Sequence, residues 1–298
     1  KLQGIKKGIE NTNYLLKTNK KKFILTIFEK RVQKKDLPFF MSLMEKLNQK
    51  KIICPRPLKD SKGKHLSKIK NKPASIVTFL SGSDKTNLNY KNCFDIGRNI
   101  AKFHKVTSKI KLYRENSMSI KKLDGLLKSI KVKSNKISSK LKPTLNMCLK
   151  DIKSQWPKKL PSGIIHGDLF IDNIFFNKNK FSGFIDFYFS SNDYLMYEIA
   201  ICINALCFDK KRNYFKMNYK KVKNLIDGYE TLRHFTKKEK DALNILCRGA
   251  ALRYLLTRIY DYFNTPKTAL IQIKDPNEYF QKLIFHNNLN NYKDYYKQ

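Results

Sequence analysis

The chain has 298 residues, of which 41% are hydrophobic, and this length suffices for one large domain or for two lobes with cores of their own. Its formal net charge of +38 would by itself suggest a nucleic acid or an anionic membrane as partner. The lysines are spread from Lys1 to Lys297, however, so we interpret the charge mainly as compositional drift and expect no nucleic-acid partner. Electrostatic steering of anionic substrates stays compatible with it.

The cysteines and the most apolar segment indicate the compartment. Six cysteines lie far apart, with no CxxC pair and no zinc-binding spacing, which favours reduced thiols and a cytoplasmic location. The apolar run 194–208 is shorter than the roughly 20 residues of a membrane span and contains Glu198 and Asn204, so we expect a buried helix and no membrane partner. No signal peptide is recognisable, and the start at Lys1 without Met suggests that the native N-terminus is missing.

The N-terminal part reads as a small antiparallel sheet with one helix. Two strands, within 8–17 and 22–30, flank a turn and predict a hairpin. A helix is expected over 36–49, with Asp36 as N-cap and an apolar face made of Phe40, Leu43, Met44 and Leu47. Further strands are expected at 66–69 and 74–80, before the turn SGSD. We place a boundary there, between an N-terminal lobe (1–82) and a C-terminal lobe (83–298).

The remainder is mainly helical. The spacing of apolar residues predicts a helix from Asn92 to His104, and the weakly periodic segment 109–159 predicts one or two surface helices. Short β runs occur between 164 and 187, and helical patterns continue to about residue 263. Strands first and helices later, with one β island between them, indicate a two-lobed α+β enzyme.

The strongest motif is IIHGDLFIDNIFF, residues 164–176, followed by GFIDF at 183–187. Asp168 and Asn173 have the spacing of the protein-kinase catalytic loop H-R-D-x-x-x-x-N. The short turn NKNK predicts a hairpin that returns Asp186 to the side of Asn173. We therefore predict phosphoryl transfer with Asp168 as catalytic base and with Asn173 and Asp186 as magnesium ligands. Each of the three taken singly would more simply be a turn or strand-end residue.

Two other residues of this loop, His166 and Asp172, are expected to have structural roles. His166 occupies the position of the histidine in the kinase motif, and we expect it to hold the loop through its ring nitrogens rather than to transfer a proton. We interpret Asp172 as a residue that supports the loop.

Nucleotide binding is expected in the first lobe. The segment GIENTNY offers Gly8, Asn11 and Asn13 to cover the phosphates, although a plain β-turn explains it equally well. We expect adenine contacts from main-chain groups of Phe79, Leu80 and Ser81, where the lobes join.

The strand after the first hairpin departs from the protein-kinase pattern. Thr26 stands where such kinases have a phosphate-binding lysine. Lys30 shares its strand face but lies roughly 13 Å further along, at about 3.3 Å per residue. Lys30 could contact the outer phosphates and Arg31 the acceptor, but neither is a like-for-like replacement.

Several segments together resemble a known family. The segments are, in order, GIENTNYLL, FILTIFEKR, DLPFFMSLMEKL, HGDLFIDNIFF, GFIDFYFSSNDYLMYEIAICINALCF, RGAALRYLLTRIYDYFNTP and KDPNEYFQKLIFH. Together they are similar to the homoserine kinases of the aminoglycoside-phosphotransferase-like superfamily, and the resemblance covers essentially the whole chain. It implies an ATP- and Mg²⁺-dependent phosphorylation of L-homoserine to O-phospho-L-homoserine in threonine biosynthesis. It also implies that Thr26 is usual at its position. Members normally begin with a further strand and helix, again suggesting a missing N-terminus.

The acceptor site is less defined by sequence. Homoserine presents an ammonium and a carboxylate, so its pocket needs at least one acid and one base besides Asp168. The candidates are Glu198 and Asn204 on the buried helix, and Arg253 and Arg258 as carboxylate ligands. For each arginine an internal salt bridge, such as Arg258 with Asp261, is the simpler alternative.

Two other functions compete with this one. The first is another small-molecule hydroxyl kinase, acting on an aminoglycoside, choline or a sugar. The second is a nucleic-acid-binding pseudokinase, which the retention of Asp168, Asn173 and Asp186 disfavours. The oligomeric state, monomer or homodimer, stays open.

Overall fold

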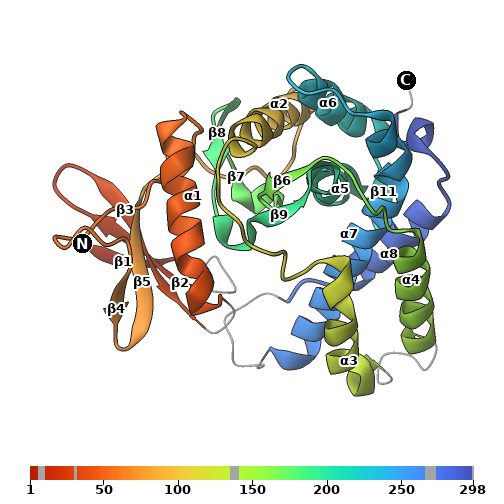
Figure 1. Cartoon of the computed structure of the whole chain (residues 1–298), viewed down its shortest axis with the longest axis horizontal. Coiled ribbons are helices and arrows are strands. Elements are labelled where there is room, and N and C mark those ends of the chain that lie inside the picture. The colour runs from red at the N-terminus through yellow and green to blue at the C-terminus, as the bar shows by residue number, and fades with distance from the viewer. Residues whose placement is uncertain (6–10, 30–31, 135–140, 266–272, 297–298) are drawn as a thin grey trace.

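The computed structural model describes residues 1–5, 11–29, 32–134, 141–265 and 273–296. Figure 1 shows a sheet with a helix packed on it on one side of the molecule and a larger, mostly helical body on the other. This is the expected two-lobed α+β fold. The sheet has the order β1-β2-β3-β5-β4 and is antiparallel throughout. Its strands are β1 Leu2–Ile5, β2 Asn11–Lys17, β3 Lys22–Phe28, β4 Ser67–Ile69 and β5 Lys72–Thr78.

Helix α1, Leu37–Gln49, covers one face of this sheet. Its apolar side is the predicted one, and all four of its members are buried: Phe40, Leu43, Met44 and Leu47. Asp36 stands at the N-cap position, but its carboxylate makes no capping hydrogen bond. It accepts instead from Arg114 Nε at 2.7 Å, so its predicted capping role is wrong and the start of α1 is tied to the other lobe.

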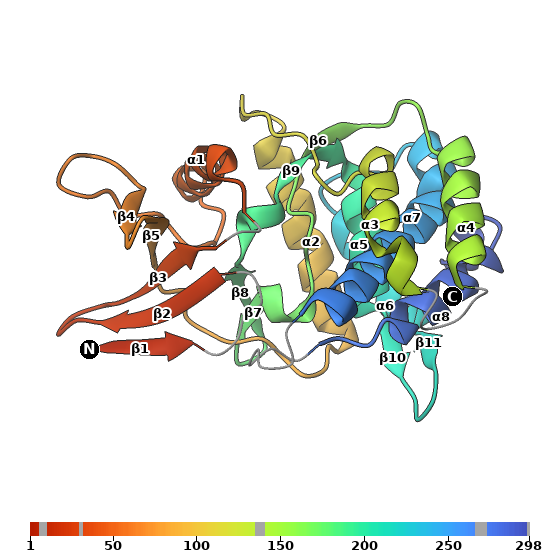
Figure 2. The same cartoon turned by 90° about the horizontal axis from the view of Figure 1, so that it is seen from below.

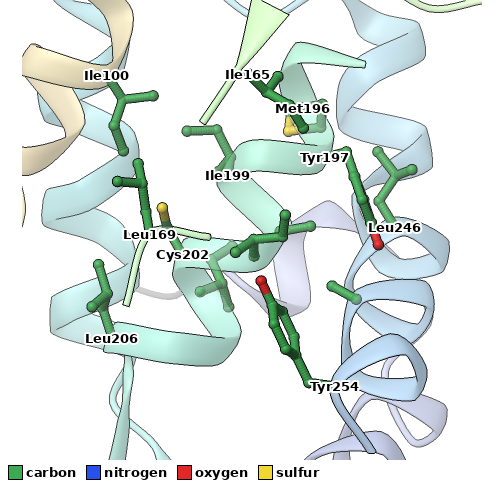
Figure 3. Packing of buried hydrophobic residues seen from close by; sticks show 14 of the residues in the cluster. Ile100, Ile165, Leu169, Met196, Tyr197, Ile199, Cys202, Leu206, Leu246 and Tyr254 are labelled. Carbon is green, nitrogen blue, oxygen red and sulfur yellow. The ribbon is translucent and has the colours of Figure 1, made fainter. Parts of the chain in front are cut away.

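The helical lobe is built around α5, Leu195–Leu206, the predicted buried helix. Figure 3 shows its side chains packed between α2, β6 and α7. The part of the chain described here has no helix long and apolar enough to cross a membrane. All six cysteines are free thiols. The other helices are α2 Tyr90–Thr107, α3 Leu123–Ser134, α4 Leu141–Gln155, α6 Tyr219–Glu230, α7 Lys237–Asn264 and α8 Asn277–Asn287.

Within the described residues, three small two-stranded sheets complete the lobe, and two of them carry the site. The hairpin of β7 and β8 lies next to the N-terminal lobe (Figure 2). Paired main-chain hydrogen bonds between Ser83 and Phe176 join it to the segment that connects the two lobes. Strands β1, β9, β10 and β11 and helix α8 are not predicted by the residue pattern. The sheets pair β6 Ser162–Ile165 with β9 Ser191–Tyr194, β7 Ile174–Asn177 with β8 Lys180–Phe184, and β10 Phe208–Lys210 with β11 Phe215–Met217.

Candidate active site

The loop after β6 carries the HGD triplet and is held from behind. Gly167 has φ of +78°, and a Cβ there would lie 2.9 Å from the carbonyl oxygen of Phe189, so only glycine fits this turn. The buried carboxylate of Glu198 accepts hydrogen bonds from the main-chain N–H groups of His166 and Gly167, the latter at 3.1 Å. Helix α5 thereby fixes the backbone just before Asp168.

The His166 side chain also holds the loop in place. Its Nε2 donates to the carbonyl oxygen of Ile185 at 2.8 Å, which ties the loop to the segment that carries Asp186. Burial lowers the pKa of His166, so the ring is neutral at physiological pH. A neutral, buried ring that connects two segments is compatible with the prediction that His166 holds the loop rather than transfers a proton.

Asp168 emerges from this loop with both carboxylate oxygens near donors. Asn173 Nδ2 donates to the main-chain oxygen of Asp168 at 2.8 Å and lies 3.3 Å from its Oδ2. The hydroxyl of Tyr254 lies 3.2 Å from its Oδ1. Burial raises the pKa of Asp168 to about 6, and the nearby Arg253 guanidinium opposes that rise. The group is therefore a carboxylate at neutral pH and a stronger base than an exposed aspartate.

The hairpin predicted from the turn NKNK brings Asp186 back to the same end as Asn173. Ile174 pairs with Phe184, and Ile185 N donates to Asn173 O at 3.0 Å. Asp186 follows in a left-handed conformation, with φ of 63°, and its side chain is exposed. Two residues later, Tyr188 packs edge-on against Phe28 and Phe40 of the first lobe. The end of the hairpin thus lies where the two lobes meet.

The donor set fits a magnesium ion bound together with a nucleotide. The amide nitrogen of Asn173 points to Asp168, so its oxygen is the atom left for a cation, and Asp186 adds a carboxylate. No group of three or more His, Cys, Asp or Glu side chains suited to a metal occurs in the described ranges. Magnesium bound by two protein oxygens, phosphate oxygens and water needs no such group.

The expected phosphate-covering residues lie only partly within the described chain. Gly8, Lys30 and Arg31 fall outside it. Asn11 and Asn13 lie on β2, where Asn11 Oδ1 is 3.4 Å from Glu29 N and Asn13 Oδ1 accepts from the Thr26 hydroxyl at 2.8 Å. Thr26 is 2% exposed, so its hydroxyl orients the Asn13 amide rather than meeting solvent.

The segment proposed for adenine links the sheet to the helical lobe. Phe79 N donates to Lys22 O at 3.3 Å, and the carbonyl oxygen of Ser81 accepts from the Ser182 hydroxyl on β8. Phe79 and Leu80 are partly buried, and Ser81 is exposed. The linker is therefore attached to both lobes beside the hairpin that ends at Asp186.

Three acceptor candidates have partners inside the protein. Glu198 is fully buried behind the loop. Asn204 donates to the carbonyl oxygens of Ala200 and Cys247 and accepts from His286 Nε2 at 3.1 Å. Arg258 Nη1 donates to Glu278 Oε2 at 2.7 Å, the internal salt bridge expected as its alternative, although with a different partner. Because these contacts engage the Glu198 carboxylate, the Asn204 amide and Arg258 Nη1 within the fold, the acceptor site proposed below does not use the three side chains.

Arg253 differs from these three candidates, and two further neighbours of Asp168, Tyr254 and Lys274, are not predicted by the residue pattern. Arg253 is 2% exposed, and its Nε and Nη1 have no hydrogen-bond partner among the described residues. Its guanidinium lies 4.7 Å from the ring centre of Tyr254, whose hydroxyl meets Asp168. Lys274 lies 3.6 Å from Asp172 and also lowers the pKa of Asp168. Both neighbours come from segments far along the chain, and only their place in the RGAALRYLLTRIYD and KDPNEY segments could have drawn attention to them.

Comparison with known proteins identifies the family of the chain. The model of the phosphotransferase enzyme family matches residues 1–235, so the chain belongs to that family. The structure is similar to that of an amicoumacin kinase in complex with AMP-PNP, Ca²⁺ and Ami (TM-score 0.69, 13% identity, 90% of this chain and 83% of the other). It is also similar to spectinomycin phosphotransferase in complex with ADP and spectinomycin (TM-score 0.64, 13% identity, 99% and 92%).

The sequence narrows the family further. The chain is 42% identical, over 284 residues, to a homoserine kinase of Sinorhizobium medicae (strain WSM419), a match that covers 95% of this chain and 86% of that protein. It is 40% identical to a homoserine kinase of Bartonella henselae (strain ATCC 49882 / DSM 28221 / CCUG 30454 / Houston 1), with coverages of 96% and 89%. Within the phosphotransferases, the chain belongs to the homoserine kinases.

Proposed function

We propose that this chain transfers the γ-phosphoryl group of ATP to the side-chain hydroxyl of L-homoserine and releases O-phospho-L-homoserine for threonine biosynthesis. The observation that carries the proposal is the arrangement of Asp168, Asn173 and Asp186 on one loop and one hairpin. It occurs in a chain 42% identical to a homoserine kinase.

Each member of this trio has a distinct task in the proposal. Asp168 accepts the proton that the homoserine hydroxyl loses as its oxygen attacks the γ-phosphorus. Asn173 holds Asp168 through its amide nitrogen and offers its oxygen, together with the Asp186 carboxylate, to magnesium. A bound magnesium ion would neutralise charge on the phosphates.

The nucleotide would lie between the lobes, here taken as 1–82 and 83–298. We propose that main-chain groups of Phe79, Leu80 and Ser81 meet the adenine. The Asn13 amide, oriented by Thr26, would meet the phosphates with help from Asn11. Gly8, Lys30 and Arg31 stay predictions for the outer phosphates and the acceptor.

The acceptor carboxylate needs a cation close to Asp168. Arg253 and Lys274 both act on the Asp168 carboxyl, as their lowering of its pKa indicates. Arg253 is nearly enclosed, whereas the Lys274 side chain is 46% exposed and lies over the ring of Phe170, 5.0 Å from its centre. We propose that Lys274 binds the homoserine carboxylate and that Arg253 contributes its charge from behind.

Replacing Lys274 with methionine is expected to raise KM for homoserine about 10-fold, because one charge-assisted hydrogen bond is lost. KM for ATP should stay near its wild-type value. Lys237→Met is the matched control, since Lys237, the first residue of α7, also forms an exposed ion pair, with Asp241. Steady-state kinetics with each substrate varied in turn make the measurement. An unchanged KM for homoserine in Lys274→Met would mean that another cationic residue binds the homoserine carboxylate.

A panel of acceptors tests the proposed reaction. ADP release is measured with ATP, Mg²⁺ and one acceptor at a time: L-homoserine, choline, ethanolamine, an aminoglycoside and a sugar. We expect turnover with homoserine to exceed that with every other acceptor. Turnover with choline or an aminoglycoside, and none with homoserine, would replace the proposal by the rival kinase function.

The last part of the proposal concerns the cellular location of the enzyme and its binding partners. We propose a cytoplasmic enzyme, since all six cysteines are free thiols. Its partner would be the small-molecule substrate L-homoserine, with neither a nucleic acid nor a membrane, and the choice between monomer and homodimer stays open.

A further inference from the structure

Tyr254 of α7 contacts the loop that carries Asp168. Its side chain is 6% exposed, and its hydroxyl oxygen lies 3.2 Å from Asp168 Oδ1 and 3.2 Å from the carbonyl oxygen of Gly167. Both neighbours are acceptors, so the phenol proton is donated to one of them at a time. Tyr254 thus contacts both the backbone of Gly167 and the side chain of Asp168.

The two oxygens of Asp168 are contacted by different elements. Oδ1 faces the Tyr254 hydroxyl, and Oδ2 faces Asn173 Nδ2 at 3.3 Å. A carboxylate has about four lone-pair sites. Two donors on opposite oxygens fix its rotation about the Cβ–Cγ bond, and the remaining lone pairs then have a defined direction. Without Tyr254, Asn173 would be the one of these two donors left to define that rotation.

We infer that Tyr254 is a positioning residue for phosphoryl transfer, which orients the Asp168 carboxylate so that it meets the hydroxyl of the acceptor. The inference rests on the proposed function, in which Asp168 is the base. A base acts only when its oxygen and the attacking hydroxyl are aligned, and misplacement by about 1 Å can reduce a rate about 100-fold. Helix α7 thereby helps to orient the base.

The position of the Tyr254 hydroxyl is set by close packing of its ring. The ring meets Phe170 of the catalytic loop edge-on, with 4.8 Å between centres, and Tyr279 of α8 at 5.2 Å. The Arg253 guanidinium lies 4.7 Å from the ring centre. Figure 3 shows Tyr254 reaching from α7 into the packed interior beside α5. A side chain held on several sides can set the direction of the group it bonds.

The same aromatic cluster contains a tyrosine without this contact. Tyr279 is fully buried, and its hydroxyl has no hydrogen-bond partner among the described residues. Packing of the cluster therefore does not require a hydroxyl at every ring. Tyr254→Phe and Tyr279→Phe remove the same atom from neighbouring rings, and only the first removes a bond to Asp168.

The test compares these two variants with the wild type in homoserine phosphorylation. Tyr254→Phe is expected to lower kcat about 10- to 100-fold, with KM for ATP, AMP-PNP affinity and the melting temperature close to wild type. Tyr279→Phe should keep kcat within about 2-fold, because loss of an unpaired hydroxyl is nearly neutral. Absence of homoserine turnover in the wild type would refute the proposed function itself. The comparison of the two variants tests the role of Tyr254, so the two failures can be told apart.

Three results would overturn the inference. The first is a wild-type kcat in Tyr254→Phe. The second is a loss of kcat accompanied by a lower melting temperature and weaker AMP-PNP binding, which would make the hydroxyl a general structural contact. The third is an equal loss in Tyr279→Phe, which would attribute the effect to the cluster as a whole.

Discussion

Replacing Asp168 with asparagine is expected to lower kcat for homoserine phosphorylation about 100- to 10,000-fold, the usual contribution of a general base. Asparagine has nearly the same shape but cannot accept the hydroxyl proton at neutral pH. The loop backbone should persist, because Glu198 and His166 hold it through contacts that do not involve the Asp168 side chain. Steady-state kinetics would measure kcat, and calorimetric titration with AMP-PNP would measure the affinity for the nucleotide.

Asp241→Asn is the control for this substitution. Asp241 is an exposed acid of α7 that pairs with Lys237 at 3.2 Å, so its loss should leave kcat unchanged. Nucleotide affinity should be retained in both variants. A kcat of Asp168→Asn within a few-fold of wild type would mean that Asp168 is not the base.

The largest expected effect on stability comes from two glycines where α2 and α6 cross. A Cβ on Gly97 would lie 2.0 Å from the carbonyl oxygen of Leu225, and a Cβ on Gly228 would lie 2.0 Å from that of Phe94. Both obstacles are backbone atoms, so the helices must move apart. Gly97→Ala and Gly228→Ala are each expected to cost about 3 kcal/mol or more, despite the better helix propensity of alanine.

Gly125→Ala is the matched control for this pair. Gly125 is also helical, but nothing lies within 4 Å of the Cβ that it would gain. Stability should therefore stay constant or rise by up to about 1 kcal/mol. Urea unfolding of the three variants measures the differences. Equal stability of Gly97→Ala and Gly125→Ala would show that α2 and α6 are not in such close contact.

Local features of the site were predictable because they depend on short stretches of chain. The turn of the β7–β8 hairpin fixes where Asp186 returns, and the spacing of Asp168 and Asn173 fixes one loop. The first hairpin and the apolar face of α1 follow from periodicity alone. The helical lobe was predicted in outline, since the run that forms α5 is continuously apolar.

Contacts between distant segments were not predictable from the pattern. Glu198 is recognisable as a carboxylate in an apolar helix, but its partners are main-chain N–H groups, which every residue except proline has. Asn204 likewise bonds to main-chain carbonyls. Tyr254 lies 86 residues from Asp168, and only the packing of α7 against the loop brings them together.

The central claim is that this chain phosphorylates the side-chain oxygen of homoserine. The measurement that tests it most directly is phosphorus NMR and mass spectrometry of the product formed from ATP, Mg²⁺ and L-homoserine by the full chain. We predict one phosphomonoester, on the hydroxyl oxygen of homoserine, formed in equal amount with ADP. Inorganic phosphate as the sole phosphorus product beside ADP, or no ADP with homoserine present, would contradict the account.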